Sequence, residues 1–388
     1  MKLNMGTPEG TRDRLFSECL ERRQVQRALV ELFRARGFDE VITPAVEYYD
    51  LFVCSGNPLP QESMLKIVDR SGKILVMRPD STAPIARVAA ARLKGRALPQ
   101  RLYYDQTVFR SGKAHDGCNS EIAQCGVELV GASGLRADLE MIALAVDSLY
   151  SSGLKEFHIE LGHADLFPVL TERLSMSEEK KEILRSCIEE KNYALLNDLL
   201  AEYQGDPCSA PLYRLPYLFG GAEVLDEVEA LAGRVDCIDY LRALYEKLSM
   251  AGYGDRVRFD LGLVHQIDYY TGVIFRAYAE GAGSPVLSGG RYDQLIGKFG
   301  YQTAAIGFAV DVDVVAGCIT TVVPALKTVI YYEPDQFLRA LRCMNEKEPG
   351  TCELSCCDSP EAALLLAREK GAAELIMMEQ EGERRIDL

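Results

Sequence analysis

Two hydrophobic periodicities follow one another at the start of the chain. Between residues 14 and 37, apolar side chains recur three or four positions apart, at Leu15, Cys19, Leu20, Val25, Leu29, Leu32 and Phe33. This spacing predicts an amphipathic helix, and Gly37 stands where a C-cap glycine belongs. The apolar and polar residues at 38–44 then predict a strand that ends at Pro44.

Strand and helix patterns alternate over the next part of the chain. Short apolar runs predict strands at residues 73–78, 102–110, 125–131 and 156–162. Helical periodicity predicts helices over about residues 81–93 and 137–152. From about residue 175 to 250, apolar residues recur at i, i+3 and i+4 with few strand signals. We therefore predict an inserted helical subdomain there.

Strand signals return after the insertion. Residues 257–261 and 273–279 read as strands, and residues 288–293 as a glycine-rich turn. After Gly317 a new alternation predicts strands at 329–332, 352–356 and 374–378 and helices at 336–344 and 360–370. Such alternation is typical of a small α/β unit.

The order of these elements predicts an α+β fold on a mostly antiparallel sheet with flanking helices. The chain has 388 residues, which is long enough for two or three domains. We expect a core at residues 1–320, with the helical insertion inside it, and a small α/β domain at residues 325–388.

Composition narrows the class of protein. No apolar run approaches the roughly 18 residues of a membrane span, and the first residues hold no signal-peptide core. We therefore expect a cytoplasmic protein without membrane contact. The net charge is −15, whereas proteins whose main partner is tRNA usually carry a basic face. No tRNA partner is expected on this electrostatic ground.

Cysteine usage gives no indication of a metal site. Of the 12 cysteines, only Cys352, Cys356 and Cys357 cluster, and no histidine lies near them. Their spacing matches no paired C-x-x-C pattern. We expect reduced, partly buried thiols, and no metal or cofactor.

The segment at residues 122–131 places polar and apolar residues on opposite sides of a strand. Gln124, Gly126 and Glu128 share one face because side chains alternate along a strand. The intervening Cys125, Val127 and Leu129 face the other way. This pattern indicates a core behind the strand and a pocket in front of it. An edge strand that shows its polar side to water is the alternative.

Several segments, in order, resemble the catalytic core of class II aminoacyl-tRNA synthetases, and specifically histidyl-tRNA synthetase. They are residues 7–13, 37–44, 77–84, 108–110, 122–131, 263–272, 288–293 and 305–314. The chain is more specifically similar to the synthetase-derived regulatory subunits of ATP phosphoribosyltransferase, the first enzyme of histidine biosynthesis. Residues 37–44 match the dimer motif of the class, so the resemblance implies a homodimer.

The resemblance also implies a histidine site. Its candidate residues are Asp80, Thr82, Arg110, Gln124, Glu128, Tyr269 and Tyr270. A carboxylate and a hydroxyl suit an ammonium group, and a carboxylate at residue 128 suits an imidazole N–H. Asp80 and Thr82 have a simpler alternative role, because both residue types are favoured caps of the helix that follows them.

Three positions depart from the pattern of the enzymes, and all three handle ATP there. Gly112 replaces a glutamate, His265 an arginine and Val314 a second arginine. Adenylation needs cations around the transferring phosphoryl group, and removing one such donor typically costs on the order of 10²-fold in rate. The side chain of valine carries no charge and cannot replace a guanidinium group. We therefore expect no synthetase activity.

The unit from Lys327 onward stands where a synthetase has its anticodon-binding domain. It holds 8 Lys+Arg against 13 Asp+Glu, a net charge of −5, which is a poor surface for an anticodon loop. It resembles a truncated form of that domain.

We expect a non-catalytic regulatory subunit that binds histidine, dimerises and associates with the short form of the catalytic ATP phosphoribosyltransferase subunit, which would carry the transferase activity. One alternative is a synthetase paralogue that activates an amino acid for an acceptor other than tRNA. A binding paralogue with another partner is the third possibility.

Overall fold

The computed structural model describes residues 5–54, 60–111, 119–264, 270–320, 325–380 and 382–388. The chain divides into two compact units, Met1–Thr320 and Thr321–Leu388.

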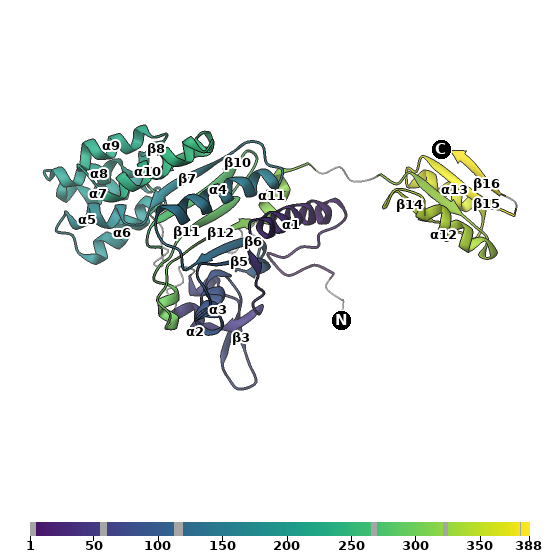
Figure 1. Ribbon diagram of the computed structural model, residues 1–388, viewed down its shortest axis with the longest axis horizontal. Coiled ribbons are helices and arrows are strands. Elements are labelled where there is room, and N and C mark those ends of the chain that lie inside the picture. Colours follow the sequence, from purple (N-terminus) through teal and green to yellow (C-terminus); the bar gives the residue numbers. More distant parts are fainter. Residues whose placement is uncertain (1–4, 55–59, 112–118, 265–269, 321–324, 381) are drawn as a thin grey trace. The chain divides into compact units, whose positions relative to one another are not determined.

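A nine-stranded sheet forms the centre of the first unit (Figure 1). Its strand order is β1-β5-β6-β12-β11-β10-β7-β9-β8. The strands are β1 (Asp39–Glu40), β5 (Gln100–Phe109), β6 (Glu121–Val130), β7 (Phe157–His163), β8 (Phe219–Gly220), β9 (Val257–Asp260), β10 (Val273–Ala279), β11 (Leu287–Arg291) and β12 (Ala305–Asp311). Neighbours pair antiparallel except β1 with β5 and β7 with β9. The predicted α+β class with a mostly antiparallel sheet is confirmed.

Helices cover one face of this sheet. They are α1 (Ser17–Ala35), α4 (Leu135–Ser151) and α11 (Val312–Cys318). The apolar stripe predicted for the first helix is buried in its C-terminal part, where Val25, Leu29 and Phe33 have no exposed surface, whereas Leu15 is 59% and Leu20 44% exposed. The three buried side chains join the inward side chains of β6 in one continuous core, so burial of this part of the stripe holds the helix on the sheet.

Further helices form the insertion between β7 and β9. They are α5 (Leu166–Glu172), α6 (Glu178–Glu189), α7 (Tyr193–Leu200), α8 (Ala210–Arg214), α9 (Glu223–Ala232) and α10 (Asp236–Met250). Leu184, Leu196, Leu225 and Leu241 are buried among them and belong to the same core as the sheet.

A smaller sheet of order β2-β4-β3 lies next to α2 (Tyr49–Cys54) and α3 (Thr82–Arg92). Its strands are β2 (Val46–Tyr48), β3 (Lys66–Val68) and β4 (Ile74–Met77).

The strand predicted at residues 38–44 is confirmed at Asp39 and Glu40, which form β1, and is wrong beyond Glu40. Side chains bind the carbonyl groups that follow. The amide of Gln106 donates to the carbonyl oxygen of Val41 at 3.0 Å. The buried guanidinium of Arg78 donates to those of Thr43 at 2.7 Å and Pro44 at 3.0 Å. These side chains thus bind carbonyl groups that a neighbouring strand would otherwise pair.

The glycine-rich turn predicted at residues 288–293 is wrong over residues 288–291, and the turn begins only at Asp293. Residues up to Arg291 form strand β11, which is paired on both sides. Its glycines serve close packing rather than a turn. A Cβ atom at Gly289 would stand 2.5 Å from the carbonyl oxygen of Gly307, and one at Gly290 would stand 2.7 Å from the ring of Tyr270.

The second unit is a four-stranded sheet of order β14-β13-β15-β16. Its strands are β13 (Thr328–Tyr331), β14 (Cys352–Leu354), β15 (Glu374–Glu379) and β16 (Gly382–Asp387). The alternating side chains of β13 supply two cores. Val329 packs with α13 (Pro360–Glu369), and Ile330 packs with α12 (Phe337–Asn345) on the other face. The sequence patterns predicted both helices and three of these strands, but not β16.

Candidate ligand-binding site

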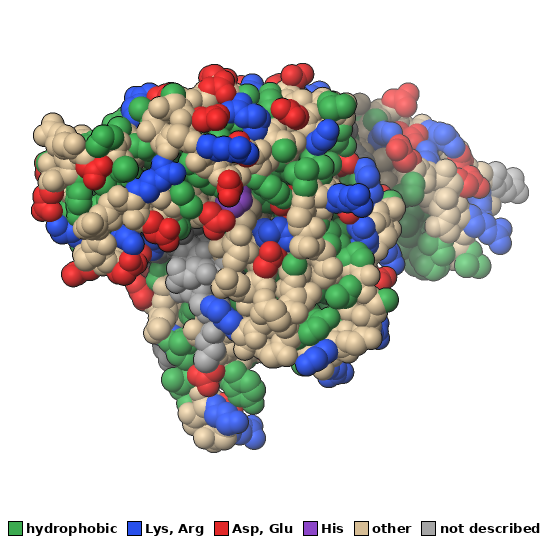
Figure 2. All heavy atoms as spheres, turned by 60° about the vertical axis from the view of Figure 1, so that its left-hand side comes forward, with side chains coloured by type: hydrophobic (Ala, Val, Ile, Leu, Met, Phe, Trp, Pro, Cys, Tyr) green, Lys and Arg blue, Asp and Glu red, His purple; other side chains and the backbone are tan. Residues whose placement is uncertain are grey.

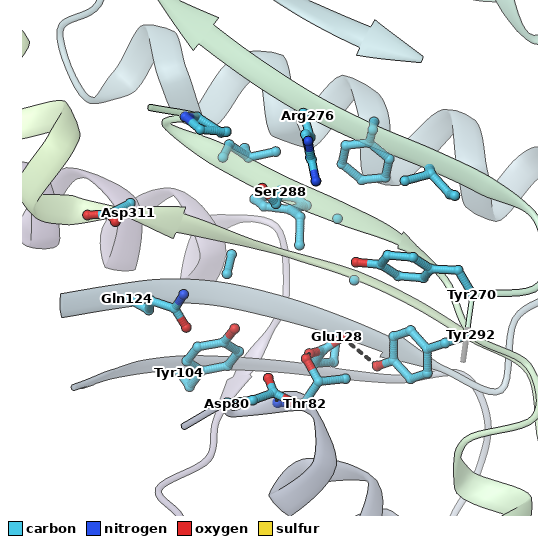
Figure 3. Close-up of a pocket in the computed structure, with 18 of the residues that line it drawn as sticks. Asp80, Thr82, Tyr104, Gln124, Glu128, Tyr270, Arg276, Ser288, Tyr292 and Asp311 are labelled. Carbon is cyan, nitrogen blue, oxygen red and sulfur yellow. Dashed lines mark hydrogen bonds between the residues drawn. The ribbon is translucent and has the colours of Figure 1, made fainter. Parts of the chain in front are cut away.

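A cavity of about 360 Å³ opens on the sheet face opposite α1 and α4. Its walls come from the start of α3 and from β5, β6, β10, β11 and β12 (Figure 3). Six of the seven predicted site residues line it, namely Asp80, Thr82, Arg110, Gln124, Glu128 and Tyr270. Tyr269, the seventh, lies outside the described residues, as do Gly112 and His265.

Strand β6 forms the floor of this cavity. It pairs with β5 on one side and β12 on the other, so the alternative of a water-facing edge strand is wrong. Gln124 and Glu128 point into the cavity, whereas Cys125, Val127 and Leu129 belong to the core behind the strand. Between the two polar residues, Gly126 makes room for a ring, because a Cβ atom there would stand 2.6 Å from the phenol of Tyr104.

Glu128 is the most deeply buried acid of the site, with 1% of its surface exposed. The hydroxyl of Thr82 donates to Oε1 at 2.8 Å, and the hydroxyl of Tyr292 donates to Oε2. Burial raises the pKa of Glu128 to about 8, although these two hydrogen bonds act in the opposite direction. A cation placed beside this carboxyl would favour its charged form.

Asp80 does two things at once. Its carboxylate accepts hydrogen bonds from the backbone N–H groups of Thr82 at 2.9 Å and Ala83 at 3.3 Å. This is the predicted alternative role at the start of helix α3. Asp80 nevertheless lines the cavity, and the hydroxyl of Thr82 is directed to Glu128 rather than to the helix backbone. The turn that begins α3 thereby holds both side chains at the cavity.

Arg110 stands on the wall just after β5. Its Nε donates to the carbonyl oxygen of Pro79 at 2.8 Å, which ties the end of β5 to the segment that carries Asp80. The cavity therefore presents a guanidinium group and carboxyl groups to the same space, the complement of a zwitterion.

The lining residues that were not predicted as site residues include Tyr104, Arg276, Tyr292 and Asp311. Burial raises the pKa of Tyr104 well above its ordinary value, so its phenol stays a neutral hydrogen-bonding group. The alternation of side chains along β10 could have indicated Arg276 from the sequence. It is the charged residue in an otherwise apolar strand, and it shares a face with Ile274, another lining residue.

The charges around the cavity balance when Glu128, with its pKa raised to about 8, holds its proton. The described lining carries three carboxyl groups, from Asp80, Glu128 and Asp311, and two guanidinium groups, from Arg110 and Arg276. Asp311 accepts hydrogen bonds from the backbone of Asp313 and Val314 at the start of α11, each at 3.1 Å. The side chain of Val314 itself packs against the core.

Within the residues that the structure describes, no group of three or more His, Cys, Asp or Glu side chains is arranged to hold a metal ion. None of the helices described is long and apolar enough to cross a membrane.

The family model and the curated relatives that match this chain agree on one family. Residues 10–315 match the family model described as histidyl-tRNA synthetase. An ATP phosphoribosyltransferase regulatory subunit of Clostridium kluyveri is 39% identical over 94% of this chain and 96% of its own length. A regulatory subunit of the same name from Clostridium acetobutylicum is 42% identical over 79% of this chain and 77% of its own length.

Solved structures agree with these relatives. A protein from Bacillus halodurans, described as an ATP phosphoribosyltransferase regulatory subunit/histidyl-tRNA synthetase, superposes with a TM-score of 0.84 and 30% identity, covering 97% of this chain and 99% of its own. A histidyl-tRNA synthetase from Nostoc has a TM-score of 0.77, covers all of this chain and 97% of its own, and is 19% identical, which shows the common fold.

Proposed function

The chain belongs to the histidyl-tRNA synthetase family and, within it, to the ATP phosphoribosyltransferase regulatory subunits, and from that premise we propose how it performs this function. The protein is a non-catalytic subunit that senses histidine in the cavity on β6 and passes that state to a separate catalytic subunit, the short form of ATP phosphoribosyltransferase. We propose that the protein acts in the cytoplasm.

The arrangement of charge in the cavity carries the proposal that the ligand is histidine. Asp80 offers a carboxylate to the α-ammonium group, and Arg110 offers a guanidinium to the α-carboxylate. Buried Glu128 and the tyrosines beside it suit an imidazole, which has both a donor and an acceptor nitrogen. The volume of about 360 Å³ lies at the small end of the roughly 300–1,000 Å³ of ligand sites, as a single amino acid requires.

The same charges argue against ATP as a second ligand. A triphosphate needs cations along its length, whereas the two guanidinium groups of the described wall face three carboxyl groups, which leaves no excess of positive charge. Val314, which stands where the synthetases have an arginine, is partly buried and packs against the core. With Gly112 and His265 in the sequence as well, we propose that the chain has lost the adenylation chemistry of its family.

A homodimer through residues 37–44 and the adjoining small sheet completes the proposal. Large apolar side chains are exposed there, among them Ile42, Tyr48, Ile67, Val68 and Ile74. An exposed apolar patch on a folded unit indicates a protein interface. A second copy of the chain would cover it.

We propose that tRNA is not a partner. Lys and Arg side chains are interspersed with Asp and Glu on the face in Figure 2 rather than gathered in a stripe, and the net charge is −15. The C-terminal unit, proposed to be a truncated anticodon-binding domain, is acidic too. Phosphate binding needs the opposite charge.

Two assays test the function. Calorimetry should show that histidine binds and that other amino acids bind more weakly. Exchange of pyrophosphate into ATP, measured with histidine and with each other amino acid, should stay at background. Robust exchange would contradict the loss of adenylation and favour the alternative of an amino-acid-activating enzyme.

A further inference from the structure

Arg276 stands between two cavities. It lines the first cavity, on β6, and it also lines a second cavity of about 530 Å³ between β7, β9, β10 and residues of the helical insertion. Among the residues that the structure describes, no other one lines both. The Arg276 side chain runs from β10 toward Ser288, into the first cavity (Figure 3). One guanidinium group can therefore act in either space.

The second cavity holds a carboxyl group that attracts this guanidinium. Glu160 on β7 is in register with Arg276 on β10 and is only 8% exposed. Burial raises the pKa of Glu160. Asp260 raises this pKa further, whereas the charges of His158 and Arg276 lower it. An imidazole is positive only when it is protonated, but a guanidinium is always charged. Arg276 is thus a permanent positive charge beside the Glu160 carboxyl.

The first cavity offers the same guanidinium a different partner. Its wall carries Asp80 and Arg110, which are proposed to hold the ammonium and carboxylate groups of histidine. Burial raises the pKa of Tyr270 in this cavity, and the charge of Arg276 acts in the opposite direction, so that charge is felt there too. A guanidinium donates two parallel hydrogen bonds to a carboxylate. A bound amino acid and Glu160 therefore compete for one cation.

We propose that Arg276 is a ligand-binding residue of the first cavity and that Glu160 holds it back. This rests on the proposed function, in which the first cavity takes histidine. Without ligand Arg276 pairs with Glu160. With histidine bound, Arg276 turns to the α-carboxylate, which Arg110 approaches from the other side.

This exchange of partners has two consequences. Two guanidinium groups then select histidine over imidazole-bearing amines that lack a carboxylate. Glu160 also loses a cation when histidine binds, so the charge of the second cavity responds to the ligand. Residues of the helical insertion, among them Glu189 and Lys191, line that cavity. The exchange therefore connects the ligand physically to the insertion.

Calorimetry with histidine and histidinol tests the binding role. Histidinol keeps the ammonium and imidazole groups but has a hydroxymethyl group in place of the carboxylate. Arg276→Gln should weaken histidine binding about ten-fold or more, because a charge-assisted hydrogen bond is lost, and should hardly change histidinol binding. Arg258→Gln is the matched control. Arg258 is in register with Glu160 from the β9 side but does not line the first cavity, so affinity for both ligands should stay unchanged.

Glu160→Gln tests the competition, with a change of sign that a purely structural role would not give. Loss of the competing carboxylate should tighten histidine binding several-fold, and this gain should vanish in the double variant with Arg276→Gln. If Arg276→Gln does not fold, Glu160→Gln alone decides the matter, because unchanged or weaker histidine binding overturns the proposal.

Two results with Arg276→Gln would also overturn it: unchanged histidine affinity, or an equal loss of affinity for histidine and histidinol. A wild-type chain that binds neither ligand is a different outcome. It contradicts the proposed histidine site itself and removes the role of Arg276 with it, whereas wild-type binding that ignores Arg276 and Glu160 leaves the histidine site standing.

Discussion

Both oxygens of the Glu128 carboxyl accept hydrogen bonds from hydroxyl groups inside a fully buried site, and the pKa of this carboxyl is raised to about 8. In the unfolded chain its pKa returns to about 4.5. Between these two values the folded protein holds a proton that the unfolded chain has lost. Folding stability therefore falls as pH rises through this window, by about 1.4 kcal/mol for each pH unit. Below about pH 4.5 the folded and the unfolded chain both hold the proton, so this loss of stability does not occur.

Glu128→Gln is predicted to remove this dependence. The amide keeps the shape and stays neutral, so the free energy of unfolding of the variant should exceed that of the wild type increasingly as pH rises from 5 to 8. Urea denaturation at several pH values measures the difference. Parallel pH profiles for the two proteins would show that Glu128 titrates normally.

Asp80→Asn separates the two roles of that residue. Asparagine caps a helix about as well as aspartate, so the free energy of unfolding should change by less than about 0.5 kcal/mol. The charge that faces the ligand is lost, and histidine affinity should fall about ten-fold or more, since charge-assisted hydrogen bonds contribute roughly 1.5–3 kcal/mol. Calorimetry and denaturation together check this. Unchanged affinity with lost stability would leave only the capping role.

At the scale of elements, periodicity located most helices and strands but missed what depends on distant partners. The first helix, predicted at residues 14–37, runs from Ser17 to Ala35, because its apolar stripe is a local property. The strand predicted at residues 38–44 ends at Glu40 because Gln106 and Arg78, far along the chain, bind the carbonyl groups that follow. No local pattern reports such a partner.

The site residues also divide into those that a local pattern predicts and those that depend on distant parts of the chain. The alternation at residues 122–131 is local, and it placed Gln124 and Glu128 on one face correctly. That the cavity also holds Tyr104 and Arg276 depends on which strands are neighbours. Sheet order is not encoded in any single segment, so these residues became visible only in the folded chain.

Gly290→Ala tests whether β11 holds the ring of Tyr270 in position beside the ligand. A Cβ atom there would stand 2.7 Å from the ring of Tyr270, so the ring must move and histidine affinity should fall by about ten-fold, on the order of 1.4 kcal/mol. Gly283→Ala is the matched control, because nothing lies within 4 Å of a Cβ atom at that position. Equal affinity in both variants would mean that Tyr270 does not contact the ligand.

At the scale of the whole molecule, the first unit carries an apolar surface that a lone copy would leave in water. Ile42 is 78% exposed and Val68 is 69% exposed. Val68→Lys should convert the proposed dimer to a monomer in light scattering, because a lysine charge buried at an interface lacks its hydration. Met250→Lys, at the exposed end of α10, is the control and should remain dimeric. A wild-type protein that is already monomeric would remove this part of the account.

The central claim is that histidine in the β6 cavity controls a catalytic subunit that this chain does not contain. The most direct measurement mixes the full chain with the short catalytic subunit of ATP phosphoribosyltransferase and records activity against histidine concentration. We predict that the chain is required for full activity, that histidine changes the rate, and that Asp80→Asn shifts the midpoint about ten-fold or more to higher histidine. A histidine response that is identical without the chain, or unchanged by Asp80→Asn, would contradict the claim.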